Sequence, residues 1–196
     1  KGGWTWGGWG DNKDLVLLYN LWYSLAVEGF HLMADLFGEK EDSRWACQVN
    51  ERLKRAFHTK FWNGNFYISP HYKGKPDDRS QALAVITGIL PESAYPVIRP
   101  FFKQQYHASP YMEKYVLEAL CMMGYYEDAL ERMKKRYYDM VESKLTTLWE
   151  GWGIGNKGYG GGSYNHAWSG GPLTILSHYF AGISPMKPAF KEFVIN

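Results

Sequence analysis

The chain has 196 residues, of which 45% are hydrophobic and 21% charged, and its formal net charge is +2. This length allows one domain with a sizeable core. Lysine and arginine are interspersed with acidic residues and form no basic run, which disfavours nucleic acid as a partner. No apolar run approaches the roughly 20 residues of a membrane span.

The aromatic fraction is unusual, at 17%, with 9 Trp, 15 Tyr and 10 Phe. These side chains build large cores, and they also stack on the apolar faces of sugars. Cys47 and Cys121 are expected to be buried free thiols, although one disulfide stays possible. The chain opens on Lys1 without an initiator methionine, which indicates a fragment and leaves the cellular location open.

The first predicted helix follows a loop over residues 1–12 that is rich in glycine and tryptophan. Asp11 or Asn12 is its expected N-cap. Apolar residues at spacings of three and four, including Phe30, Met33 and Leu36, predict a helix over residues 13–37. Six further helices are predicted over residues 40–61, 79–89, 92–105, 110–123, 126–142 and 172–180.

The connections between these helices alternate in length. The turns at Gly38 and Gly124 are very short, whereas the loops 1–12, 62–78 and 143–170 are long. In a ring of antiparallel helix pairs, long loops gather at one end and build a site there. Within the fourth helix, Pro100 is expected to cause a kink or a break. The tail is expected to be extended, with a strand from Phe190 to Ile195.

The loop 143–170 carries the residues best suited to chemistry. Glu150 lies between Trp149 and Trp152, and the indoles are expected to desolvate its carboxylate and raise its pKa. The glycine-rich stretch 158–162 is expected to be a mobile loop over a pocket. His166 precedes the last helix, where it could donate a hydrogen bond to a sugar hydroxyl or cap the helix. An acid, flat apolar faces and flexible backbone suit a sugar-cleaving pocket, while a surface glutamate is the alternative for Glu150.

Two acidic clusters at helix starts are interpreted as mainly structural. Asp77 or Asp78 is the expected cap of the third helix, with Arg79 as its ion-pair partner and substrate contact by Asp78 as the minor alternative. Glu113 is expected first as a cap of its helix and second as a pocket residue. The histidines show no paired ligand spacing, so no metal site is predicted.

Five segments, in this order, resemble the catalytic domain of the α-L-rhamnosidases of glycoside hydrolase family 78, particularly a Bacteroidetes-type branch. The segments are Trp6–Asn12, Asp78–Val85, Ala108–Leu120, Thr146–Glu150 and Asn165–Gly170. The family domain is an all-α, (α/α)6 six-hairpin toroid of twelve helices. The resemblance therefore implies its C-terminal half, with about seven helices over residues 1–182. Residues 183–196 would begin the connection to a C-terminal β-sandwich.

The resemblance also implies an activity, the release of terminal α-L-rhamnose or a related sugar by an inverting mechanism without a cofactor. Glu150 would be the general base, and the general acid would lie upstream of this sequence. His166 and Trp9 would contact the sugar. The other implied substrate-binding residues are Asp11, Asp78, Trp149 and Trp152. Relatives commonly carry aspartate where this chain has Gly8, so specificity could differ.

The implied partners are a carbohydrate and the rest of the same polypeptide, with no nucleic acid and no membrane. Half a toroid exposes apolar faces, so the fragment alone is expected to be inactive and to associate with itself or with the remainder of its chain. A bacterial periplasmic or secreted location is favoured over the cytoplasm. The alternatives are a non-catalytic carbohydrate-binding relative, another α/α-toroid glycosidase, or a polysaccharide lyase with Tyr164 or His166 as its base.

Overall fold

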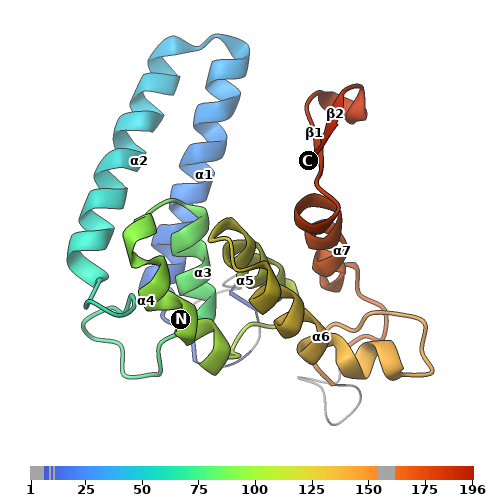
Figure 1. The fold of residues 1–196 in the computed structure, drawn as a ribbon. Coiled ribbons are helices and arrows are strands. Elements are labelled where there is room, and N and C mark those ends of the chain that lie inside the picture. The colour runs from blue at the N-terminus through green and yellow to red at the C-terminus, as the bar shows by residue number, and fades with distance from the viewer. Residues whose placement is uncertain (1–6, 9, 11, 154–161) are drawn as a thin grey trace. The chain divides into compact units, whose positions relative to one another are not determined.

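The computed structural model describes residues 7, 8, 10, 12–153 and 162–196. Contacts divide the chain into two units. The first consists of Lys1–Gly7 and Asp11–His107, and the second of Gly8–Gly10 and Ala108–Asn196. The described residues form seven α-helices and one short β-hairpin (Figure 1), in agreement with the predicted helical architecture.

The first unit is dominated by a long antiparallel hairpin of α1 (Leu15–Phe37) and α2 (Lys40–Phe61), which Figure 1 shows side by side. Gly38 has a φ of 76°, and its N–H donates to the carbonyl of Asp35 over 3.1 Å. Glycine adopts this left-handed conformation without steric cost, so it ends α1 and allows the short turn. The predicted hairpin and its turn are confirmed.

The N-cap of α1 differs from the prediction. Asp14, rather than Asp11 or Asn12, caps the helix, and its carboxylate accepts from the backbone N–H of Leu17 over 3.3 Å. The same carboxylate accepts from the N–H of Ser69 over 2.8 Å. Asn12 instead binds the backbone of Lys75, at 2.8 and 2.9 Å. A contact that is distant in sequence therefore selects the cap.

The buried face of α1 also differs in its second half. Leu17, Leu18 and Leu21 are buried, but Phe30 and Met33 are exposed, as is Leu36. Within the first unit, Figure 1 shows only α2 beside this distal part of α1. Phe30 packs edge-to-face on Trp45 of α2, with the ring centroids 5.9 Å apart. The apolar stripe predicted for α1 is therefore buried in the first half of the helix and exposed in the second half.

Helix α3 (Asp78–Ile86) is the central helix of the first unit, because every residue from Asp78 to Val85 is buried. It is followed by a 3-10 turn, Glu92–Ala94, and by α4 (Tyr95–Gln104). A kink or a break was expected at Pro100, and the break does not occur, since α4 continues through this residue. Pro100 lies on the exposed face, where water can bind the carbonyl group that proline leaves without an N–H partner.

The second unit contains the hairpin of α5 (Pro110–Met122) and α6 (Tyr126–Glu142), which turns at Gly124. Helix α7 (Gly171–Ile175) continues as one π-helical turn, Leu176–Phe180. Strands β1 (Ile183–Pro185) and β2 (Phe193–Ile195) pair antiparallel, with Ser184 opposite Val194. The predicted helices are confirmed, and the last strand begins three residues later than predicted.

The two cysteines are free, but only one is buried. Cys121 lies in the core of the second unit, where burial raises the pKa of its thiol to about 12. Cys47 is exposed, so its predicted burial is wrong. Its neighbour Ala46 lies on the packed face of α2 together with Asn50 and Phe57. One residue along a helix turns the side chain by about 100° away from that face.

Candidate active site

Backbone hydrogen bonds hold the Glu150 segment against the segment that contains His166. The N–H of Glu150 donates to Ser163 over 3.0 Å, and the N–H of His166 donates to Leu148 over 2.9 Å. The indole N–H of Trp168 donates to the carbonyl of Glu150 over 3.1 Å. These bonds join the two ends of the glycine-rich loop and bring Glu150 and His166 close together.

Ser163 binds the Glu150 carboxylate directly, with two hydrogen bonds to one oxygen. Its backbone N–H and its hydroxyl donate to Oε2 over 2.8 and 3.0 Å. The Nδ1 atom of His166 lies 3.8 Å from the same oxygen. The Glu150 side chain is 20% exposed. Within the described residues, the hydrogen bonds to this carboxylate all reach Oε2.

The pKa of Glu150 is lowered, which contradicts the predicted rise. The backbone N–H of Ser163 is the main cause, because it stabilises the ionised form. Burial opposes this effect, while the Ser163 hydroxyl and the nearby His166 add to it. The carboxylate is therefore ionised at neutral pH and can accept a proton.

The two flanking tryptophans have packing partners of their own. Trp149 is 4% exposed and belongs to the core. The indole N–H of Trp152 donates to the carbonyl of Ala108 over 2.7 Å. The Arg136 guanidinium lies 4.0 Å from the centroid of the Trp152 ring. Substrate binding by Trp149 and Trp152 stays a prediction, and their observed contacts are structural.

A cluster of aromatic rings, from His166, Trp168 and Tyr111, lies beside the Glu150 carboxylate. The rings of His166 and Trp168 lie 4.2 Å apart, between centroids, at an angle of 47°. Trp168 also packs on Tyr111 of α5, with centroids 5.4 Å apart. This stacking orients the imidazole beside Glu150. His166 is 34% exposed and so can meet a ligand.

Glu113 of α5 forms a buried ion-pair network with Arg132 and Arg136 of α6. The sequence analysis did not predict this network. Glu113 accepts from Arg132 at both carboxylate oxygens, over 2.6 and 3.0 Å. Arg136 lies 3.7 Å from Glu113 and also donates to the carbonyl of Ala108. Glu113 is fully buried, and its observed partners are the two arginines of α6; its roles as a cap and as a pocket residue stay predictions. The network joins α5 to α6 and holds Trp152, two residues after Glu150.

The acidic cluster at the start of α3 lies in the first unit. Asp77 caps α3 through the N–H of Arg79 and forms an ion pair with the Arg79 guanidinium over 2.7 Å, as predicted. Burial raises the pKa of Asp77, and the positive charge of Arg79 opposes the rise. Asp78 is fully buried and accepts from the backbone N–H of His107 over 3.1 Å. Its contact with substrate stays a prediction.

Three of the sequence predictions concern residues outside the described part of the chain. These are the sugar contacts Trp9 and Asp11 and nearly all of the glycine-rich stretch 158–162. Gly8 is described, with a φ of 75°, and a Cβ atom there would lie 2.4 Å from Oγ of Ser109. A larger residue at position 8 would therefore clash with Ser109, a restriction that the sequence did not reveal.

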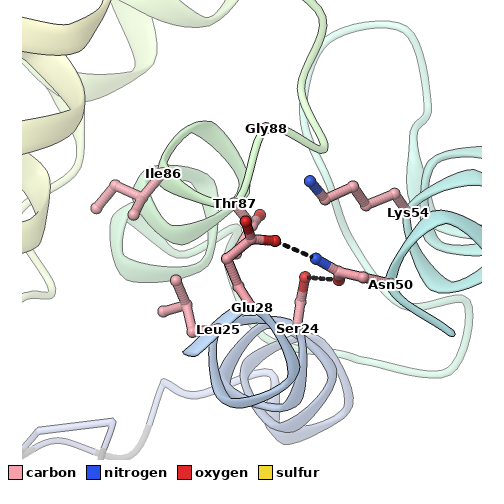
Figure 2. A pocket seen from close by; sticks show the side chains of 8 residues that line it. All are labelled: Ser24, Leu25, Glu28, Asn50, Lys54, Ile86, Thr87 and Gly88. Atoms are coloured by element: carbon pink, nitrogen blue, oxygen red, sulfur yellow. Dashed lines mark hydrogen bonds between the residues drawn. The ribbon is translucent and has the colours of Figure 1, made fainter. Parts of the chain in front are cut away.

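Glu150 lines neither of two hollows in the described part of the chain. In the first unit, a polar cavity of about 240 Å³ lies among α1, α2 and the end of α3. Figure 2 shows Asn50 bonded to Ser24 and Glu28, with Lys54 on the same side of the cavity as Asn50. In the second unit, an apolar groove of about 490 Å³ lies between α6 and α7; its lining residues include Met133, Tyr137, Tyr138, Val141, Leu148, Leu173 and Leu176. Neither hollow contains a predicted site residue.

No group of three or more His, Cys, Asp or Glu side chains among the described residues is arranged to hold a metal ion. In the same part of the chain, no helix has the length and apolar character needed to cross a membrane.

The chain belongs to the family of bacterial α-L-rhamnosidase six-hairpin glycosidase domains, whose model matches residues 2–180. This match confirms the family resemblance and the six-hairpin fold class. No curated protein gives a significant match to the chain.

Solved structures agree with this fold. The α-L-rhamnosidase from Dictyoglumus thermophilum is similar over 95% of this chain, with a TM-score of 0.77 and 21% identity. The native enzyme from Aspergillus terreus is similar over 94%, with a TM-score of 0.75 and 18% identity. A rhamnosidase from Klebsiella oxytoca with rhamnose bound is similar over 85%, with a TM-score of 0.69 and 21% identity. The chain spans 22%, 23% and 34% of these three structures.

Proposed function

We propose that this chain is part of a glycoside hydrolase that releases terminal α-L-rhamnose, or a related sugar, with inversion at the anomeric carbon. Glu150 is the proposed general base. The observation that carries the proposal is the Glu150 carboxylate itself, whose ionised form is stabilised by hydrogen bonds from Ser163 and which lies beside the partly exposed imidazole of His166. Membership of a glycosidase-domain family supports the reaction class.

The proposed mechanism follows from the chemistry of an ionised carboxylate. Inverting glycosidases use one carboxylate to take a proton from water while a carboxylic acid, roughly 6.5–9.5 Å away, protonates the leaving oxygen. Glu150 offers Oε1 to that water, because Ser163 binds Oε2. His166 is the proposed contact to a sugar hydroxyl. The general acid is proposed to come from another part of the full-length protein.

The rest of that protein is also the proposed partner of the apolar groove between α6 and α7. Tyr138, Val141 and Leu173 are exposed there. Burial of such side chains against further helices would stabilise the unit by removing apolar area from water. The β1–β2 hairpin over residues 183–196 is proposed to lead into the next domain, and periplasmic or secreted location stays a prediction.

The test is Glu150→Gln in the full-length protein, assayed on an aryl α-L-rhamnoside. The amide keeps the shape of the side chain but cannot accept the proton, so kcat is expected to fall roughly a hundred- to ten-thousandfold. Binding of rhamnose, measured by calorimetry, should persist. Glu142→Gln is the matched control, because Glu142 is exposed at the end of α6 in the same unit.

Two outcomes would contradict the proposal. Activity of Glu150→Gln within a few-fold of the wild type would refute the assignment of the base. A wild-type protein that binds rhamnose but cleaves no aryl glycoside would favour the non-catalytic alternative.

A further inference from the structure

Ser163 lies between the two polar side chains of the candidate active site. Its Oγ is 3.0 Å from Oε2 of Glu150 and 2.9 Å from Nδ1 of His166. The direct distance from Nδ1 to Oε2 is 3.8 Å, which is too long for a hydrogen bond. The Ser163 hydroxyl therefore connects the carboxylate to the imidazole.

The number of available protons fixes which atom donates in each of the two hydrogen bonds of the Ser163 hydroxyl. A serine hydroxyl has one proton to donate, and an ionised carboxylate can only accept. The Ser163 proton therefore points to Glu150, which leaves a lone pair of Oγ facing Nδ1 of His166. Two lone pairs at 2.9 Å would repel each other, so the proton between these atoms must come from the imidazole.

We propose that Ser163 is a positioning residue that holds the proton of neutral His166 on Nδ1 and so presents Nε2 to the sugar as a hydrogen-bond acceptor. The inference rests on the proposed function for the identity of the ligand. It differs from the expectation from sequence, in which His166 donates to a sugar hydroxyl.

The environment of the ring supports this role for Nε2. Packing against Trp168, at 4.2 Å between centroids, fixes the plane of the imidazole. Among the described residues, none forms a hydrogen bond with Nε2, and the side chain is 34% exposed. Each sugar hydroxyl can donate one proton, so a bare Nε2 selects a hydroxyl that is oriented to donate.

The test reads the tautomer directly in the full-length protein. With histidine labelled by ¹⁵N, the chemical shifts of the two ring nitrogens distinguish the tautomers, and the spectrum of His166→Asn identifies the signals that belong to His166. At a pH where His166 is neutral, the wild type should carry the proton on Nδ1. Ser163→Ala removes the hydroxyl and should shift the population to the Nε2-protonated form.

The same variants are measured for turnover. Ser163→Ala removes the hydroxyl that binds Glu150 and His166. A fall of about tenfold in kcat/KM is expected from this loss. Ser163→Thr keeps a hydroxyl and should restore both the tautomer and the rate. Ser177→Ala, at an exposed serine of the same unit, should change neither.

A wild-type proton on Nε2, or an unchanged tautomer in Ser163→Ala, would overturn the inference. The tautomer is read without turnover, so its result is independent of the Glu150→Gln assay. An active Glu150→Gln enzyme would refute the general base, whereas the tautomer alone decides the role of Ser163.

Discussion

The buried pair of Glu113 and Arg132 predicts a large loss of stability when one partner is changed. Glu113 is 0% and Arg132 4% exposed, and two hydrogen bonds of 2.6 and 3.0 Å join them. Glu113→Gln would leave the guanidinium buried without its countercharge. Breaking a buried pair in this way costs about 3–5 kcal/mol. Replacement of both Glu113 and Arg132 by methionine should recover part of that loss, because the buried Arg132 charge is gone and only Arg136, whose side chain is 11% exposed, lacks the carboxylate.

The assay is urea unfolding of the full-length protein, followed by tryptophan fluorescence. Trp152, beneath Arg136 of the same network, is one reporter of this region. Glu118→Gln is the matched control on α5, since the pair of Lys114 and Glu118 is partly exposed, with 30% and 22% of the side chains accessible. Such surface pairs contribute roughly 0–1 kcal/mol. A loss below about 1 kcal/mol for Glu113→Gln, or a double variant as unstable as the sum of the single ones, would refute the reasoning.

Three further predictions concern stability and association. Gly8→Ala should destabilise the second unit by about 1–3 kcal/mol, because the new Cβ meets Ser109 and the φ is positive; an unchanged midpoint of unfolding would contradict this. Asp14→Ala should cost about 1–2 kcal/mol, since α1 loses its cap and Ser69 its acceptor, and a thermal melt with an unaltered midpoint would count against that role. The 196-residue chain should self-associate through its apolar groove, and a clean monomer in sedimentation velocity would speak against it.

The sequence predicts helix ends well where the signal is local. Gly38 and Gly124 end helices because their own backbone conformations require glycine, and Pro110 begins α5 because proline suits a first turn. The cap of α1 could not be chosen in the same way. Asp14 is selected by Ser69, which lies 55 residues further along the chain.

The electrostatics of the candidate site were the least predictable part. The neighbours of Glu150 in sequence are tryptophans, but its neighbours in space are the N–H and hydroxyl of Ser163, across the glycine-rich loop. No local pattern reveals that contact, and it reverses the direction of the pKa shift. Arg132 was missed for a similar reason, since its partner Glu113 lies 19 residues away on another helix.

The close approach of Gly8 to Ser109 has a consequence for any substitution at position 8. A side chain at position 8 and the hydroxymethyl group at position 109 compete for one space, with 2.4 Å between the two atoms. An aspartate grafted at position 8 from a related enzyme would therefore need a smaller residue at position 109 and a different backbone conformation in the loop. Covariation of positions 8 and 109 is expected among homologues. A variant of the loop at position 8 should therefore be made together with a change at position 109.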